Sequence, residues 1–437
     1  MLKLFSSTIK NKGRSFIDLY AGLGGFHQGL RFLGHECVWA CEKNNHLVEL
    51  YKKNYPGVEL GKDIFKIKPE DIPKHDILTA GFPCQPFSRS GYMKGFKDLK
   101  RGNHFFKIIE ILEYHKTEYF ILENVDTIKK HDKGNTFKII IDELKKIGYD
   151  LNYQVISPHE FNIPQLRKRV FIVGRLKTKG SLQHFNFPQK EKKQNSTINS
   201  LNFKSLPGEK LSLNETEKEA LKVWEEFLLN FPEPEMLPSF PIWTMEFGAN
   251  YEFENYTPYY SSKEDLVGRR GLFGEIIPDL SKEKILENYM PRYSISNQET
   301  LPAWKKNYIR QNREFYKRFK SYIDPRMNKI KSIKAHSYQK LEWSCKGEST
   351  NLEDKIIQFR PSGVRISRNR WIPTLTTIKT QNIYLKTIDR RLSILEHEQL
   401  QSQKFKYHPN HLNGGYMALG NSVNSEVVKR IAKNLII

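Results

Sequence analysis

Short apolar runs alternate with amphipathic stretches along the first 175 residues of the chain. Runs of strand length lie at 16–20, 37–41, 76–80, 119–123 and 170–174. The later runs have continuously apolar cores, as strands buried on both faces of a parallel sheet require. The alternation of these runs with helical stretches predicts a doubly wound α/β sheet.

Three helices are predicted between these runs, and the first covers 26–33. The other two show apolar residues at helical spacing, at Phe105, Ile108, Ile109 and Leu112, and at Phe137, Ile140, Ile141 and Leu144. Gly148 is expected to end the last of them.

Periodicity is weaker from about residue 176 to 360, where Pro, Asn and aromatic residues are frequent. One clear helix is predicted there. It starts after the N-cap Asn214, with Glu217 three residues on, and ends near Leu229. The tail from Arg390 is again expected to be helical, with a last helix after Asn421. We therefore divide the chain into domains 1–175 and 176–371 and a C-terminal segment, 372–437.

Two stretches of the second domain have opposite charge. Residues 231–260 are rich in Pro and aromatic residues and carry an excess of acid. Residues 301–340 hold twelve Lys or Arg against two acidic residues, and aromatic residues such as Tyr308, Phe315 and Tyr338 are interleaved with them.

The overall composition narrows the function classes. The 437 residues carry 71 Lys plus Arg against 49 Asp plus Glu, a net charge of +22, so a polyanion partner is indicated, most simply nucleic acid. The apolar runs are too short to span a membrane, and no signal peptide is evident at the start. Four cysteines without a CxxC pair favour a reduced compartment over a disulfide scaffold or a zinc module. We expect a cytoplasmic protein that binds neither a membrane nor a metal.

A glycine-rich turn follows the first predicted strand, in the sequence Asp18-Leu19-Tyr20-Ala21-Gly22-Leu23-Gly24-Gly25-Phe26. Such a turn lets a ligand approach the backbone, although a purely structural turn would be as common. Glu42 ends the next strand, where a carboxylate can accept hydrogen bonds from ribose hydroxyls. Asp63 and Ile64 follow a third short strand and could contact an adenine edge. Together these residues favour an adenosine-containing cofactor.

Three further motifs fall at predicted strand ends. Cys84 lies between prolines in Gly81-Phe82-Pro83-Cys84-Gln85-Pro86-Phe87-Ser88, where a nucleophile is more useful than a buried thiol, and 88–101 could form a lid. Glu123 and Asn124 end another strand; a carboxyl group beside a nucleophile can be protonated or bond a ring nitrogen, or be an ordinary strand-end acid.

The third of these motifs is Gln165-Leu166-Arg167-Lys168-Arg169. Arg167 and Arg169 are two residues apart, so they are predicted to face the same side of a strand. They could hold an anion or a carbonyl group there, or they could simply form a solvated basic edge. Near the C-terminus, Gly420-Asn421-Ser422-Val423-Asn424 reads as an N-capped helix start.

Taken in this order and spacing, the motifs closely resemble the cytosine-5 DNA methyltransferase family, over about 14–175 and 372–437. The resemblance implies a Rossmann-like, S-adenosylmethionine-dependent methyltransferase sheet with a second, smaller target-recognition domain. It also implies that S-adenosylmethionine is the cofactor, with S-adenosylhomocysteine as product, and that double-stranded DNA is the substrate.

The resemblance assigns roles to the catalytic candidates. Cys84 would attack C6 of cytosine, Glu123 would bond N3 and the exocyclic amine, and Arg169 would hold the base. Support from neighbouring side chains would come from Arg167, Gln165 and Asn124, the last by bracing the Pro83-Cys84 backbone. The target base would have to be flipped out of the duplex.

The resemblance also assigns the cofactor site. Its residues would be Asp18, Tyr20, Ala21, Gly22, Gly24, Gly25, Glu42, Asp63 and Ile64, with Asn421 and Ser422 closing the site from the C-terminal side. Tyr20 departs from the usual Phe but still offers a ring. The segment 391–396 lacks the usual Pro-Arg-Glu, which leaves the packing of the target-recognition region in question, but not the chemistry.

The variable region 176–371 would read the DNA sequence. Its basic stretch 301–340 would either hold phosphates and stack on bases or be a solvated helical face with packed aromatic residues. The segments Arg360-Pro361-Ser362-Gly363-Val364-Arg365 and Pro373-Thr374-Leu375-Thr376-Thr377 are expected to begin the return to the first domain.

The sequence thus predicts a DNA (cytosine-5-)-methyltransferase of the compact prokaryotic or phage type. We expect a monomer that is the modification partner of a separate restriction endonuclease. The rivals are a tRNA cytosine-5 methyltransferase, whose Cys-Phe-Thr signature is absent here, and a catalytically inactive DNA-binding homologue. A dehydrogenase would leave the motifs around Cys84 and Glu123 unexplained.

Overall fold

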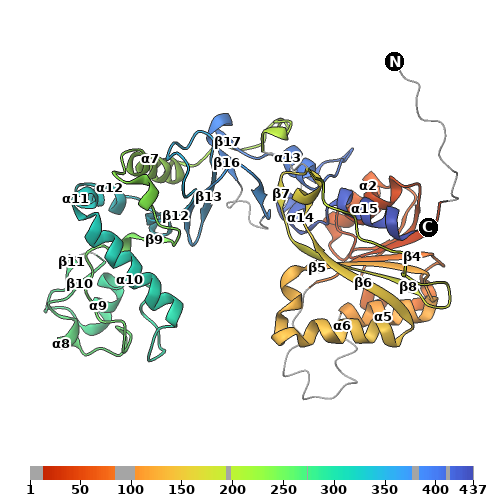
Figure 1. The fold of residues 1–437 in the computed structure, drawn as a ribbon, viewed down its shortest axis with the longest axis horizontal. Helices are drawn as coiled ribbons and strands as arrows, with labels where there is room; N and C mark the ends of the chain where they lie inside the picture. The colour runs from red at the N-terminus through yellow and green to blue at the C-terminus, as the bar shows by residue number, and fades with distance from the viewer. Residues whose placement is uncertain are drawn as a thin grey trace. The chain divides into compact units, whose positions relative to one another are not determined.

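The computed structural model describes residues 13–83, 104–192, 198–272, 274–375, 383–409 and 414–436. The chain forms two compact units (Figure 1). The first comprises Met1–Glu209, Arg370–Lys379 and Ser393–Ile437, and the second comprises Lys210–Asn369 and Thr380–Leu392. None of the described helices is both long enough and apolar enough to cross a membrane.

A seven-stranded sheet forms the centre of the first unit, in the order β3-β2-β1-β4-β5-β8-β6. Its strands are β1 (Ser15–Leu19), β2 (Glu36–Cys41), β3 (Glu59–Gly61), β4 (Ile77–Gly81), β5 (Tyr119–Val125), β6 (Tyr149–Ile156) and β8 (Arg169–Leu176). The first five strands are parallel. The predicted α/β fold class is therefore confirmed.

Two features of this sheet were not predicted. Strand β8 pairs antiparallel with both β5 and β6, although its apolar core suggested a parallel strand. Strand β6 was missed altogether, because several of its residues are exposed or half-buried and no continuous apolar run marks it.

Helices cover both faces of this sheet (Figure 1). They are α1 (Gly25–Arg31), α2 (Asn45–Asn54), α5 (His104–His115), α6 (Asn135–Lys146) and α15 (Ser425–Leu435). Successive strand residues point to opposite faces. Phe16 and Ile121 therefore join the core beneath α1 and α15, whereas Ile17 and Leu122 join the core beneath α5 and α6. The predicted helices at 26–33, 105–112 and 137–144 are all present.

The predicted C-terminal segment, 372–437, is divided between the units: Thr380–Leu392 belongs to the second unit and the rest to the first. It holds α13 (Ile394–Leu400), α14 (Gly415–Asn421) and α15. A Cβ atom at Gly29 of α1 would lie 2.7 Å from Val428 of α15, so the two helices approach closely only because this residue is glycine. The short strand β15 (Ile372–Pro373) pairs parallel with β7 (Gln165–Leu166), so the chain returns at Pro373, as expected. Thr376 and Thr377 lie outside the described residues.

The first unit extends along the chain beyond residue 175, where the sequence placed the domain boundary. Leu182, Phe185 and Phe187 are buried in the same core as α1 and α15. These side chains tie the following segment to the sheet, and the observed division falls after Glu209.

A six-stranded sheet organises the second unit, in the order β17-β16-β13-β14-β12-β9. Its strands are β9 (Ile242–Trp243), β12 (Lys340–Ser344), β13 (Ile356–Arg360), β14 (Gly363–Ser367), β16 (Tyr384–Leu385) and β17 (Arg390–Arg391). A separate pair joins β10 (Arg270–Gly271) to β11 (Gly274–Glu275). The helices are α7 (Glu215–Leu229), α8 (Lys263–Leu266), α9 (Lys282–Tyr289), α10 (Ala303–Arg318), α11 (Lys320–Ile323) and α12 (Met327–Lys331).

The sequence anticipated only part of this unit. Helix α7 is confirmed, with Asn214 and Glu217 forming a capping box. The sheet was missed, because its strands have at most five residues. The segment Arg360–Arg365 was expected to begin the return to the first unit, and this prediction is wrong. The segment instead contains the turn between β13 and β14.

The two oppositely charged stretches of this unit pair with each other. On α10, Arg310 contacts Glu254 at 2.5 Å, Arg313 contacts Glu246 at 3.0 Å and Arg318 contacts Glu233 at 2.7 Å. The aromatic residues Phe315 and Phe319 are buried in the core with α7. Of the two interpretations of 301–340, packed aromatic residues on a helical face agree better with these contacts.

Candidate active site

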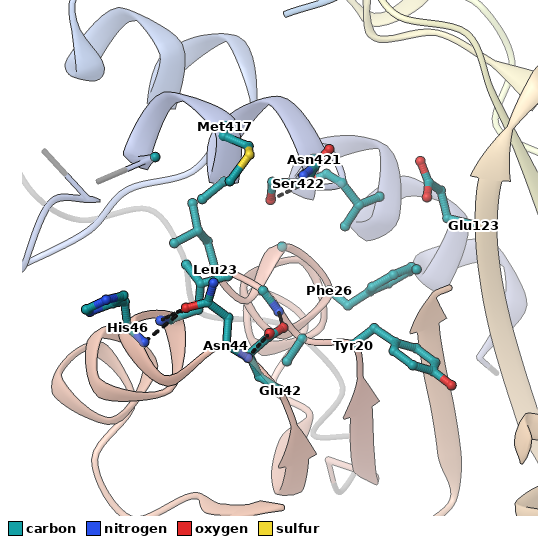
Figure 2. A pocket seen from close by; sticks show the side chains of 18 residues that line it. Tyr20, Leu23, Phe26, Glu42, Asn44, His46, Glu123, Met417, Asn421 and Ser422 are labelled. Carbon is teal, nitrogen blue, oxygen red and sulfur yellow. Dashed lines mark hydrogen bonds between the residues drawn. The ribbon is translucent and has the colours of Figure 1, made fainter. Parts of the chain in front are cut away.

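A pocket of about 310 Å³ opens at the carboxyl ends of the parallel strands of the first unit. Its wall includes Gly81, the last residue of β4, and Glu123, two residues before the end of β5. The loops after β1 and β2 complete this part of the wall (Figure 2). Such a strand edge is where open α/β sheets bind their ligands. Seven predicted cofactor residues line it: Tyr20, Ala21, Gly22, Gly25, Glu42, Asn421 and Ser422.

The glycine-rich turn shapes one wall of this pocket. Gly22 and Gly24 have φ angles of 54° and 81°, in the left-handed region that favours glycine. A Cβ atom at Gly24 would also lie 2.6 Å from the ring of Tyr55, whose hydroxyl donates to the carbonyl of Leu23 at 3.0 Å. Gly24 therefore serves the packing of the turn, while Gly22 faces the pocket.

Glu42 joins two loops at the base of the pocket. One carboxylate oxygen accepts a hydrogen bond from the main-chain N–H of Gly22 at 2.9 Å, and the other accepts from Asn44 at 2.8 Å. Asn44 in turn caps α2 by accepting from His46 and Leu47. The carboxylate is thus held in one orientation, and each of its oxygens keeps further lone pairs for a ligand.

The opposite wall comes from the C-terminal segment (Figure 2). Met417 and Asn421 of α14 and the following Ser422 line the pocket there. Gln403 donates from Nε2 to the hydroxyl of Ser422 at 2.6 Å, which fixes this wall against the α13 region. The last helix start was predicted at 420–424, and Asn424 does cap α15.

Several lining residues were not predicted: Leu23, Phe26, Asn44, His46, Leu47, Met417, Ala418 and Val423. Phe26 lies inside the glycine motif that was singled out. Asn44 could have been found as an N-cap directly after the strand that Glu42 ends. The Met417 region carried no comparable signal.

Asp18 does not line the pocket. It is fully buried and accepts a hydrogen bond from the hydroxyl of Thr79 on β4 at 3.1 Å. Burial raises its pKa well above the usual range, although Thr79 and the N–H of His27 partly oppose this. Asp18 therefore supports the strand that carries the turn instead of lining the cavity.

Asp63 and Ile64 also lie outside the described lining. The carboxylate of Asp63 accepts from the N–H of Phe65 at 3.2 Å and pairs with Lys43 at 3.5 Å. The bond from Phe65 is the main reason that the pKa of Asp63 is lowered. Ile64 is buried in the core beneath α5. Their predicted contact with an adenine edge stays a prediction.

Glu123 lines the pocket and is 8% exposed. Its carboxylate contacts Nε of Arg169 at 2.8 Å. Burial raises the pKa of Glu123, and the charges of Arg169 and Arg167 oppose that rise without cancelling it. The carboxyl group therefore keeps a proton at higher pH than an ordinary glutamate does.

Arg167 connects this carboxyl group to the cofactor pocket. Its guanidinium is 2% exposed and donates from Nη2 to the carbonyl of Ser422 at 3.0 Å. Burial, with the nearby charge of Arg169, lowers its pKa to about 9. Nε and Nη1 have no hydrogen-bond partner within the described part of the chain, nor does either amide atom of the buried Gln165.

Arg167 and Arg169 were predicted to lie on one strand, and this prediction is wrong. Strand β7 ends at Leu166 and β8 begins at Arg169, so Arg167 lies between them. Both side chains nevertheless act on Glu123. Asn124 donates to the carbonyl of Phe82 at 3.0 Å, two residues before Cys84. Cys84 itself and the proposed lid, 88–101, lie outside the described residues.

This geometry is that of an α/β protein with a nucleotide-type cofactor pocket beside a buried, cation-flanked carboxyl group. The sequence model described as C-5 cytosine-specific DNA methylase matches residues 14–232. The chain belongs to this family.

Named relatives resemble the chain to different extents. Type II methyltransferase M.HaeII of Haemophilus aegyptius is 45% identical over 173 residues, 40% of this chain and 52% of that protein. M.DsaV of Dactylococcopsis salina is 40% identical over 181 residues, 41% and 51% of the two chains. The chain thus spans about half the length of these two relatives. M.AluI of Cellulosimicrobium cellulans is 27% identical over 97% of this chain and 92% of its own.

Proposed function

We propose that the chain transfers a methyl group from S-adenosylmethionine to C5 of cytosine in double-stranded DNA. One observation carries this proposal. Glu123 lines the cofactor pocket and pairs with Arg169, while Arg167 bonds to Ser422 of the same pocket. A group able to hold a cytosine ring therefore lies beside the pocket that would supply the methyl group.

The residues of the pocket fit S-adenosylmethionine. The carboxylate of Glu42 has lone pairs available for ribose hydroxyls, and the volume of about 310 Å³ is at the lower end of the usual range for such ligands. The rings of Tyr20 and Phe26 line the wall and would favour a positively charged sulfur. When bound, this cofactor supplies an electrophilic methyl group.

The proposed chemistry begins at Cys84. Its thiolate attacks C6 of the cytosine, while the proton of Glu123 bonds N3 and Arg169 holds the carbonyl oxygen of the base. C5 becomes nucleophilic and would take the methyl group, while the electron pair of the broken carbon–sulfur bond would stay on the sulfur of S-adenosylhomocysteine. A base then removes the C5 proton, and the electron pair of that bond expels the Cys84 thiolate. Asn124, bonded at Phe82, would hold the backbone that presents the thiol.

The second unit would read the target sequence, and the base would leave the duplex to reach Glu123. The relatives are named type II methyltransferases. This supports a role in DNA modification beside a separate restriction endonuclease, with DNA protection as its outcome.

The test measures transfer of a labelled methyl group to duplex DNA and to tRNA. Wild-type protein should label DNA only, and Cys84→Ser should abolish labelling. The matched control is Cys345→Ala, since burial raises the pKa of that thiol to about 12 and keeps it unreactive. DNA containing 5-fluorocytosine should trap a covalent adduct, because C5 then has no removable proton. Labelling of tRNA alone would establish the RNA-modifying rival, and DNA binding without an adduct would indicate an inactive homologue.

A further inference from the structure

The sheet of the second unit has two different faces. Trp343, Phe359 and Ile366 point into the core that holds α7 and α10. Strand residues alternate in direction, so Glu342, Arg360 and Arg365 point to the opposite face. The register pairs Glu342 with Arg365 across adjacent strands, and Arg365 with Gln358 on the next.

The turn between β13 and β14 is rigidly supported. Arg360 and Gly363 form the last pair before the turn, whose two central residues, Pro361 and Ser362, are exposed. Gly363 has a φ of 136°, and a Cβ atom there would lie 2.8 Å from the carbonyl oxygen of Lys340. The end of this hairpin is thus packed against β12 at a distance that only glycine allows.

Two guanidinium groups share one carboxylate on this face. Glu342 accepts a hydrogen bond from Nη2 of Arg360 and lies 3.1 Å from Nε of Arg365. The side chains of Arg360, Glu342 and Arg365 are 20%, 26% and 33% exposed. The Nε atoms of Arg360 and Arg365 are both buried, so only the Nη groups can reach a ligand. The cluster of two guanidinium groups and one carboxylate therefore keeps a net positive charge on a fixed support, and the bond of Arg360 to Glu342 uses only one of its two Nη groups.

We propose that this hairpin end reads a guanine-containing base pair in the DNA target, through Arg365 and Arg360, with Glu342 as a positioning residue. A planar guanidinium bonds O6 and N7 of guanine in the major groove. A guanidinium group that a carboxylate already holds in place loses little conformational entropy when it binds a base. This assignment rests on the proposed DNA methyltransferase function.

The test compares sequence preference, not only activity. Wild type, Arg365→Gln and Arg360→Gln are incubated with a duplex library of random sequence, and the methylated cytosines are sequenced. Loss of one reading contact should reduce discrimination at one base pair by about 5- to 150-fold. Substitution by Lys at either position keeps the positive charge but removes the planar guanidinium group. The Lys variants should therefore lose sequence preference at the same base pair as the Gln variants.

The matched control is Arg310→Gln, which removes an exposed arginine paired one-to-one with Glu254 and should leave the preference unchanged. Thermal unfolding and cofactor binding check that each variant is folded, and the Lys variants carry the test if a Gln variant is not. A uniform loss over all sequences, with a shallower salt dependence, would mean phosphate contact and overturn the inference. A wild-type protein that methylates no duplex would overturn the proposed function as well.

Discussion

In the first unit the guanidinium of Arg167 is buried with two of its nitrogens unpaired, and the neighbouring Gln165 has an unpaired amide. In the second unit the arginines of α10 each face a carboxylate. Buried polar groups are normally satisfied, and Arg167 is also bonded to Ser422 of the pocket, so we expect a ligand near its unpaired nitrogens. Unpaired buried atoms occur on α10 as well, at Nη2 of Arg313, but not beside a described pocket of this kind. Charge density alone, which drew attention to 301–340, marked a region in which the α10 arginines pair with acidic residues of the same unit.

The largest effect is expected at Glu123. Glu123→Gln removes the proton donor to N3 and should lower the rate of methyl transfer by about 10²- to 10⁴-fold while cofactor binding is kept. Glu118→Gln is the matched control, because Glu118 is also paired with arginines, Arg14 and Arg175, but does not line the pocket. Single-turnover rates measure both. Equal losses in the two variants would show that ion pairing in general, and not this site, limits the reaction.

A substitution at Arg313 tests whether the ion pairs of α10 in the second unit stabilise the fold. Its partner Glu246 is fully buried and also accepts from the hydroxyl of Tyr293 at 2.8 Å. Arg313→Gln should leave an uncompensated buried carboxylate and cost about 3–5 kcal/mol in the free energy of unfolding, measured with urea. The double variant Arg313→Gln, Glu246→Gln should recover much of this loss. A single variant as stable as wild type would contradict a structural role for this pair.

Glu42 and Asp63 were both predicted to bind the cofactor, but their positions in the structure differ. Glu42 lines the pocket, whereas the carboxylate of Asp63 accepts a hydrogen bond from the N–H of Phe65 and pairs with Lys43. Glu42→Ala should weaken S-adenosylmethionine binding by about 10-fold or more, as for lost hydrogen bonds to a charged group. Asp63→Asn should weaken it less. Calorimetric titration gives both dissociation constants, and the reverse order would move the ribose site away from Glu42.

The contrast between the units also explains what the sequence could reveal. Strands β4 and β5 were predictable because burial on both faces makes their residues continuously apolar. In the second unit, Glu342, Arg360 and Arg365 alternate with core residues on strands of five, and such short strands carry little signal. The partners of Glu123 could be predicted from motifs. The pairing of 301–340 with 231–260 could not, because it depends on contacts between distant parts of the chain.

Asp18 gives a prediction about pH. Its folded-state pKa is raised by burial, so the folded chain keeps a proton that the unfolded chain releases above about pH 4. Wild type should therefore lose stability relative to Asp18→Asn as the pH rises from that value through the raised pKa. Urea midpoints at pH 5, 6.5 and 8 measure this difference. A difference that stays constant with pH would mean that Asp18 is charged in the folded protein.

The smallest effect is expected on α10. Arg310→Gln with Arg318→Gln breaks two exposed ion pairs, each worth under about 1 kcal/mol, and should leave DNA affinity within about twofold. Lys331→Gln with Lys334→Gln is the comparison, because the described part of the chain shows ion pairs for Lys317, Lys320 and Lys329 of this stretch but not for these two lysines. Phosphate contacts would lower the slope of log affinity against log salt by about 0.9 per charge removed. A drop of about two for the arginine pair would favour the phosphate-binding interpretation of 301–340, since α10 would then exchange its carboxylates for phosphates on binding.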